Sequence, residues 1–320
     1  MRKVSVLLAI CLLLASVPAS AQIDLTGSWA SRLHEDYIER GPGSDLGDFT
    51  GLPLSDEARA KALTFEATIP SMIERQCLPH SPWVNLYRPL PMRIWSEIDS
   101  AGSIVAWKLS GDFLKDVVTI WMDGRPHPSP NAFHPFSGFT TGRWEGDTLT
   151  TRTTHIKTAS IRRGNGIPGS DRSVITAHIA RHDDLLTVMT IQTDDVYLTE
   201  PHVVTRVWQL DPRGNVARWN SCDAVTEIPR LEDTGVVPHY LPGENPQADF
   251  IARTYNVPLE AAMGHAHTLY PEYRKTLRKA YVLPQQCGRY CCGWIEAQGR
   301  PEAAPNLRCI TSGDGKLPPP

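Results

Sequence analysis

The fold of this chain is decided by residues 173–193, SVITAHIARHDDLLTVMTIQT. Apolar and polar residues alternate through residues 173–181 and again through residues 185–193, which is the period of a strand with one buried face. The Asp183-Asp184 pair between the two runs favours a tight turn. The stretch therefore predicts an antiparallel β-hairpin.

The pattern of this hairpin continues on both sides of it. Turn sequences rich in Gly and Asp separate several further runs, and no helix recurs between them, which argues against a parallel α/β fold. About eight to ten successive antiparallel strands are typical of a barrel or a strongly bent sandwich. The sequence therefore predicts a mainly β protein built on an antiparallel barrel. The expected strands are residues 92–99, 103–110, 116–122, 141–145, 147–157, 173–181, 185–193, 203–211 and 216–222.

The N-terminus predicts export. Two basic residues precede an apolar run over residues 4–17, and the small residues Ala19 and Ala21 are typical of a cleavage site. Residues 1–21 are therefore expected to be a secretory signal peptide, and the mature protein is expected to be periplasmic or secreted.

Composition divides the rest of the chain into two parts. Residues 22–222 are expected to form the barrel domain, with a loop and a helix inserted at about residues 32–91. In residues 223–320, glycine and proline separate short helical runs, which indicates an extension wrapped on the barrel. The predicted fold is thus a β-barrel with a partly helical C-terminal extension.

Overall charge and hydropathy exclude two classes of partner. The 320 residues carry a net charge of −3 and contain no basic run, so nucleic-acid binding has no electrostatic support. After the N-terminal run, no apolar stretch reaches the roughly 18 residues that a membrane span needs. The expected partner is a small organic molecule, and the oligomeric state is left open.

The cysteines predict disulfides. Cys11 is expected to leave with the signal peptide, and six cysteines remain. An even number of cysteines in an exported chain is typical of a disulfide framework. The first two are expected to pair with each other, and the two adjacent cysteines of the C-terminal cluster are expected to pair with the two that flank them. A metal site is the alternative, but the cluster lacks the paired C-x₂-C spacing of zinc sites, so no metal or other cofactor is predicted. The candidates are Cys77, Cys222, Cys287, Cys291, Cys292 and Cys309.

Several stretches resemble known proteins. LTGSW, residues 25–29, resembles the G-x-W start of the first strand in lipocalins and related calycins. IWMDGRPHP (120–128), GRWEGDTL (142–149), TTHIK (153–157) and YLTEP (197–201) resemble stretches in a widespread family of secreted bacterial proteins without an assigned reaction. This resemblance implies a calycin-like barrel and export, and it implies no particular chemistry.

Alternating positions on the predicted strands nominate a ligand site. If their polar and aromatic faces point into the barrel, Trp supplies stacking area, Arg pairs with a carboxylate and His forms hydrogen bonds. Such a cavity suits an apolar or aromatic compound that bears a carboxylate or hydroxyl group. The alternative is that these faces point to solvent. The candidate ligand-binding residues are Arg93, Trp95, Glu97, Trp107, Trp121, Arg125, His155, His178, Arg206 and Trp208.

An enzyme is the second hypothesis. In IWMDGRPHP two prolines fix an extended path, so the loop is rigid enough to present a site. His127 or His155 would act as acid or base in a cofactor-free lyase, isomerase or hydrolase acting on an aromatic or terpenoid compound. Asp123 or Glu97 would orient the histidine, and Arg125 or Arg206 would hold substrate charge. A structural turn, or a metal held by His127 and His134, are the alternatives at this loop.

Two further segments have weaker signals. RRGNGIPGSDR, residues 162–172, is expected to be a lid loop at the barrel mouth. His265 and His267 are spaced for chelation only from an extended segment, and no third ligand is evident. A third reading is an interaction module on the cell envelope, with a closed core and the contact surface on residues 229–320.

Overall fold

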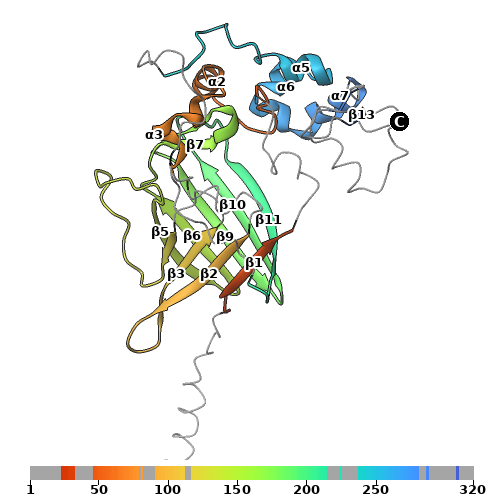
Figure 1. Ribbon diagram of the computed structural model, residues 1–320. Helices are drawn as coiled ribbons and strands as arrows, with labels where there is room; N and C mark the ends of the chain where they lie inside the picture. The colour runs from red at the N-terminus through yellow and green to blue at the C-terminus, as the bar shows by residue number, and fades with distance from the viewer. Residues whose placement is uncertain are drawn as a thin grey trace, which may run out of the picture.

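A computed structural model describes residues 23–32, 46–78, 81, 91–111, 117–214, 224, 237–280, 286–287 and 308–309. The predicted signal peptide, the predicted strand at residues 216–222 and three of the cysteines, Cys222, Cys291 and Cys292, lie outside these residues. The described part is a β-barrel with short helices gathered at one end (Figure 1).

Nine strands close into the barrel, in the order β1-β11-β10-β9-β6-β5-β4-β3-β2. The first strand pairs with both the second and the last, and this closes the sheet. The mainly β, mainly antiparallel barrel is thereby confirmed. The strands are β1 (Gly27–Ser31), β2 (Met92–Ile98), β3 (Ile104–Gly111), β4 (Val118–Trp121), β5 (Phe139–Glu145), β6 (Thr148–Thr154), β9 (Val174–His182), β10 (Leu185–Thr193) and β11 (His202–Leu210).

The hairpin of residues 173–193 forms as predicted. β9 and β10 pair antiparallel, with Ile179 opposite Val188, and Asp183 takes the left-handed conformation in the turn (φ 52°). Every second residue is buried, as in Ile175, Ala177 and Ile179 on β9. The alternation of apolar and polar residues therefore predicts correctly which face of β9 and of β10 points into the barrel, because only one face of each strand is apolar.

One connection differs from the expectation of tight antiparallel turns. β4 and β5 pair parallel, with Ile120 opposite Thr140, and residues 122–138 cross between them as a long loop. The prolines after Asp123 have no N–H to donate, so the chain cannot fold back on β4 as a hairpin. The chain instead returns along the barrel before β5 begins.

The glycine of the G-x-W motif has a packing role. Gly27 has a φ of 151°, and a Cβ at this position would lie 2.5 Å from Cδ1 of Leu210. The positive φ therefore favours glycine here, and a larger residue would also displace the side chain of Leu210. The likeness to calycins remains a prediction.

A cap of short elements covers one end of the barrel (Figure 1). Ser55 begins the first helix by accepting a hydrogen bond from the backbone N–H of Ala58 (3.1 Å). A second apolar core, which includes Phe49, Leu52 and Ile167, joins the cap to the barrel connections. The elements of the cap are α2 (Asp56–Leu63), η2 (Ile69–Ser71), α3 (Ile73–Gln76), β7 (Ala159–Arg162), η3 (Arg163–Asn165) and β8 (Ile167–Gly169).

The described part of the C-terminal extension is partly helical, as expected. It contains α5 (Phe250–Tyr255), α6 (Leu259–Ala262), η4 (Ala266–Leu269), α7 (Pro271–Ala280), β12 (Gln286–Cys287) and β13 (Arg308–Cys309). None of the described helices is long and apolar enough to cross a membrane.

The cysteine pairings remain predictions. Cys77 is disulfide-bonded, and its predicted partner Cys222 lies outside the described residues. Cys287 and Cys309 stand opposite each other where β12 and β13 pair in parallel.

Candidate ligand site

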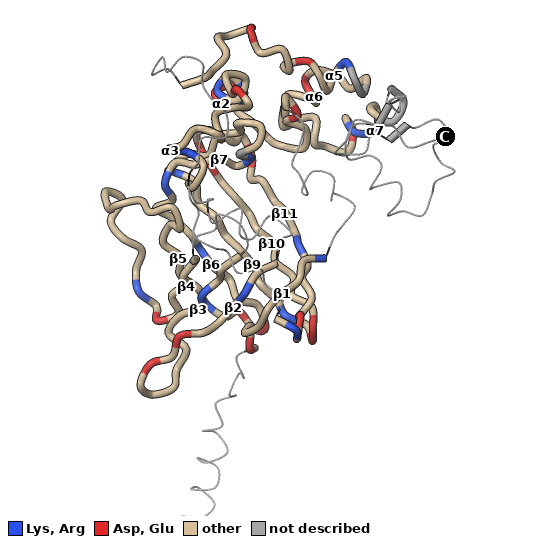
Figure 2. Tube along the Cα trace, viewed as in Figure 1, with Lys and Arg blue, Asp and Glu red and all other residues tan. Residues whose placement is uncertain are grey.

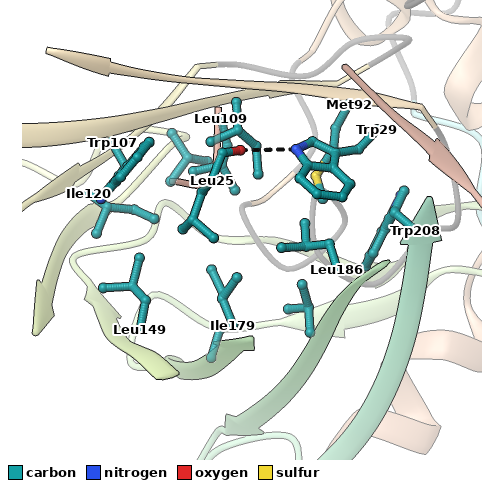
Figure 3. Close-up of a cluster of buried hydrophobic side chains, with 14 residues drawn as sticks. Leu25, Trp29, Met92, Trp107, Leu109, Ile120, Leu149, Ile179, Leu186 and Trp208 are labelled. Carbon is teal, nitrogen blue, oxygen red and sulfur yellow. Dashed lines mark hydrogen bonds between the residues drawn. The ribbon is translucent and has the colours of Figure 1, made fainter. Parts of the chain in front are cut away.

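One half of the barrel interior is a packed apolar core (Figure 3). Trp29, Trp107 and Trp208 are each 0% exposed, and Nε1 of Trp29 donates to the carbonyl oxygen of Leu25 at 3.0 Å. Trp107 and Trp208 point inward. They pack in this core and line neither of the two cavities described below, so these tryptophans do not form the expected ligand cavity inside the barrel.

Several predicted wall residues lie on the outer surface instead. On β2, Met92 and Ile94 are buried, so Arg93, Trp95 and Glu97 face outward. Both faces of this strand carry large side chains, and the core selects the more apolar one.

The same correction applies to the neighbouring strands. Trp121 lies outside the barrel, where the guanidinium of Arg125 stacks 3.6 Å from its ring centroid. His178 also faces outward, with its Nδ1 3.1 Å from Oγ1 of Thr150. These three residues therefore belong to the barrel surface.

The other half of the barrel interior contains polar side chains among apolar ones. Arg206 is 3% exposed and lies on the inward face of β11. Thr151, Thr153 and Thr190 are buried on strands of the same barrel, and His202 is buried on the same face of β11 as Arg206. A small apolar cluster, separate from the main core, is formed by Ile156, Ile175 and Val204. Toward the capped end the interior therefore changes from a continuous apolar core to a mixture of polar and apolar groups.

A buried carboxylate organises this polar end. Asp194 follows β10, and five hydrogen bonds converge on its two oxygens. Oγ and the backbone N–H of Ser170 donate at 2.8 and 2.7 Å, and Oγ of Ser173 donates at 2.5 Å. The backbone N–H groups of Val196 and Tyr197 complete the set. Such full satisfaction marks Asp194 as a positioning group.

Gln192 lies next to this carboxylate on β10 and is 4% exposed. Its Nε2 donates to Oγ of Ser173 at 3.2 Å. Its Oε1 is buried and has no hydrogen-bond partner among the described residues. Gln192 therefore presents an acceptor to its surroundings.

A cavity of about 310 Å³ lies at the rim, between the cap helices and the β7–β8 hairpin. It has apolar walls, two cationic side chains and several hydroxyl groups, and none of its described lining residues is acidic. Figure 2 shows basic residues, in blue, near α3; α3 itself carries Arg75 and, next to it, Glu74. The lining residues that matter most are Lys61, Phe65, Ile69, Arg75, Phe136 and Ser160.

The shape of this cavity depends on a glycine. Gly166 has a φ of 72°, and a Cβ there would lie 2.3 Å from Cβ of Phe65. Only glycine lets the aromatic wall lie this close to the turn before β8. Lys61, on the same side, donates to the hydroxyl of Tyr197 at 3.0 Å.

A second, much smaller cavity of about 10 Å³ lies inside the rim. Both cavities are lined by Ser81, Ala159 and Ser160, so they adjoin. The inner one extends to Ser173 and Gln192. It therefore links the rim to the polar end of the barrel.

The segment expected to be a lid loop forms much of this rim. Residues 162–172 contain the end of β7, the turn η3 and all of β8, so the expectation of a loop is wrong. Arg172 forms an ion pair with Asp195, which fixes its end.

The histidines predicted to be catalytic form a separate chain on the flank of the barrel. His127 contacts Oγ1 of Thr154 through Nδ1 (2.7 Å) and Oγ1 of Thr141 through Nε2 (2.9 Å). Oγ1 of Thr154 also lies 2.8 Å from Nδ1 of His155, whose Nε2 donates to the carbonyl oxygen of Ser129. His155 has a φ of 55°, which is strained for histidine.

The electrostatics of His127 differ from the expectation. Burial, together with the charges of Arg152 and His155, lowers its pKa. Asp123 bonds to Arg125, which lowers the pKa of the aspartate, so the expected orientation of His127 by Asp123 is wrong. Neither cavity is lined by a histidine among the described residues.

No metal site is found in the described part of the chain. No group of three or more His, Cys, Asp or Glu side chains there is arranged to hold an ion. His134 donates from Nδ1 to the carbonyl oxygen of Ile156 (3.1 Å), and His267 lies 3.2 Å from a carboxylate oxygen of Glu260. These contacts assign both side chains to hydrogen bonding.

The residues that sequence reasoning missed come from distant segments. Lys61 lies in α2 and Phe65 follows it, whereas Phe136 lies in the crossover loop. Gln192 lies near the end of β10, and Asp194 follows this strand. No sequence spacing relates these residues to one another. The one available signal is the change of the inward side chains of β10 from apolar at Val188 to polar at Gln192.

Comparison with known proteins gives no further assignment, because no family model, curated protein or solved structure matches the chain.

Proposed function

We propose that this protein binds a small amphipathic anion, with an apolar or aromatic body and a carboxylate, in the rim cavity. The observation that carries this proposal is a 310 Å³ space with aromatic walls and two cations. Ligand sites are typically about 300–1,000 Å³, mostly apolar, with a few polar groups that orient the ligand.

The lining supplies both parts of the recognition. Phe65 and Phe136 offer apolar area to the ligand body. Lys61 attracts a carboxylate, and none of the described lining residues is acidic. Hydroxyl groups such as that of Ser160 add hydrogen bonds that orient the ligand.

We place this activity outside the cytoplasm, in the periplasm or the medium. The basic start, the apolar run and the small residues before Gln22 support export, as does the disulfide-bonded Cys77. The pairing of the remaining cysteines into a C-terminal staple, and a calycin-like ancestry, are parts of the same proposal.

The enzyme hypothesis is the second candidate. The strained His155, which shares the hydroxyl of Thr154 with His127, favours it, because strain often accompanies function. The linings of the cavities favour binding, because their described residues include no histidine.

The test is the binding of a fluorescent aromatic sulfonate and of a neutral analogue with the same ring system. The wild-type protein should bind the anion at least about tenfold more tightly than the neutral analogue, as one well-placed charge contact contributes roughly this much.

Matched variants locate the site. Lys61→Gln should lose most of the preference for the anion, whereas Lys108→Gln, which removes a cation from the barrel surface beside Glu97, should keep it. Equal affinity for the two probes, or equal effects of the two variants, would contradict the proposal. Loss of binding in His127→Ala with Lys61→Gln unaffected would favour the enzyme hypothesis.

A further inference from the structure

Gln192 and its neighbours determine what the inner cavity can bind. The side chain is 4% exposed, lines the inner cavity, and carries an Oε1 with no hydrogen-bond partner among the described residues. A buried polar atom of this kind is rare in folded proteins, because it has lost its water without gaining a partner.

The direction of the amide follows from Asp194. Five donors converge on this carboxylate, so its oxygens act only as acceptors. Ser173 has one hydroxyl proton and directs it to Oδ2 of Asp194 at 2.5 Å. Oγ of Ser173 must therefore accept its other hydrogen bond.

The bond that Oγ of Ser173 accepts comes from Gln192. Only the amide nitrogen of the glutamine can donate, and Nε2 lies 3.2 Å from Oγ of Ser173. A flipped amide would place two acceptors against each other, so the network fixes the orientation of the amide. Oε1 is the atom left to the cavity.

The inner cavity is small, and its lining combines apolar and polar side chains. Its volume of about 10 Å³ is close to what one water molecule or one terminal polar group needs. Ile156, Ile161 and Ile175 form its apolar walls, and serine hydroxyl groups also line it. Among these lining residues, Oε1 of Gln192 is the buried oxygen without a hydrogen-bond partner, so it is the acceptor open to a donor group. The cavity adjoins the rim cavity through Ser81, Ala159 and Ser160.

We infer that the inner cavity is a specificity subsite for a hydrogen-bond donor. Resting on the proposed function, this names the ligand class: an amphipathic carboxylate whose buried end carries a hydroxyl group. The carboxylate lies in the rim cavity near the cations, and the hydroxyl group donates to Oε1 of Gln192. Asp194 and Ser173 are positioning residues that act through Gln192.

The experiment compares three medium-chain acids by calorimetry on the mature protein. They are an ω-hydroxy acid, the ω-methoxy acid and the parent acid with a terminal methyl group. The wild-type protein should bind the hydroxy acid at least about tenfold more tightly than the other two, because the methoxy and methyl ends cannot donate to a buried acceptor.

Two variants assign the effect to one atom. Gln192→Leu keeps most of the side-chain volume and removes the acceptor, so the preference for the hydroxy acid should disappear or reverse. The control is Gln209→Leu, the same change at an exposed position of β11, which should keep the preference.

The outcomes separate this inference from the proposed function. If all three acids bind the wild-type protein equally, the donor subsite is wrong and binding in the rim cavity stands. If none of the acids binds and the sulfonate probe also fails, both proposals fail. If Gln192→Leu does not fold, the three wild-type affinities still decide, because a hydroxy acid that binds no better than the methoxy acid overturns the subsite.

Discussion

The two ends of the barrel interior are built by the same strands and differ in how many polar side chains they bury. On β10, Leu186 and Val188 pack in the apolar core, whereas Thr190 and Gln192 continue the same inward face among polar groups. On β11 the change runs from Trp208 to Arg206. Alternation determines which residues of a strand point into the barrel. The chemistry of those inward residues determines whether that part of the interior is an apolar core or can hold a polar site.

Truncation of a side chain in the apolar core should have the largest effect. Trp29→Ala removes a fully buried ring, so the free energy of unfolding of the protein should fall by about 3–5 kcal/mol. Urea denaturation followed by circular dichroism measures this. The matched control is Trp95→Ala on the outer face, which should cost less than about 1 kcal/mol. A similar loss in both variants would contradict the assignment of faces.

Removal of the Asp194 carboxylate should have the second largest effect on stability. Asp194→Ala leaves several buried donors without an acceptor, so the free energy of unfolding should fall by about 3 kcal/mol. Asp195→Ala is the control, because the neighbouring aspartate forms only a surface ion pair with Arg172 and should contribute less than about 1 kcal/mol. Equal losses would mean that the polar end is not organised by Asp194.

The rim should be sensitive to a single methyl group. Gly166→Ala forces a strained φ and a clash with Phe65, so it should cost about 1–2 kcal/mol and weaken binding of the sulfonate probe. Gly164→Ala lies two residues away in open space and should leave both quantities nearly unchanged. Thermal unfolding with and without the probe measures both effects. Unchanged binding in Gly166→Ala would remove Phe65 from the site.

The smallest expected effect is on the pH dependence of stability, and it arises from His127 on the flank of the barrel. The pKa of His127 is lowered in the folded state, so as pH falls the unfolded chain takes up this proton first. Stability should therefore decrease as pH drops below the ordinary histidine value of 6.5. In His127→Gln this decrease should be smaller, and in the exposed control His182→Gln it should match the wild type. Identical slopes of unfolding free energy against pH in all three proteins would contradict the burial of His127.

Sequence reasoning succeeded where one face of a strand is clearly more apolar. The hairpin of residues 173–193 meets this condition. It failed on β2, because the hypothesis of a polar cavity nominated the face of Arg93, Trp95 and Glu97, whereas the closed barrel buries the more apolar face of Met92 and Ile94. It also failed at β4, because a turn signal such as Asp123-Gly124 says nothing about where the chain goes next.

The candidate site was harder to predict than the fold. Its residues are brought together by closure of the barrel and by the cap, and no periodicity or spacing relates Lys61 to Phe136 or Gln192. Polar residues at the ends of buried strands are the local sign of such a site. The histidines and tryptophans attracted the prediction because of their chemistry, although most of them serve packing or the outer surface.

Closure by the first strand has a consequence for how the protein is made. β1 pairs with β2 on one side and with β11 on the other, so the barrel cannot close until the chain has been made as far as residue 210. Contacts this far apart in the chain form slowly, because the intervening loop must first lose its freedom. Until then β1 and β11 are open edges that can pair with other chains. We therefore expect the newly made protein to depend on dilution or a chaperone for its final step, and a circular permutant that joins β11 directly to β1 should fold faster.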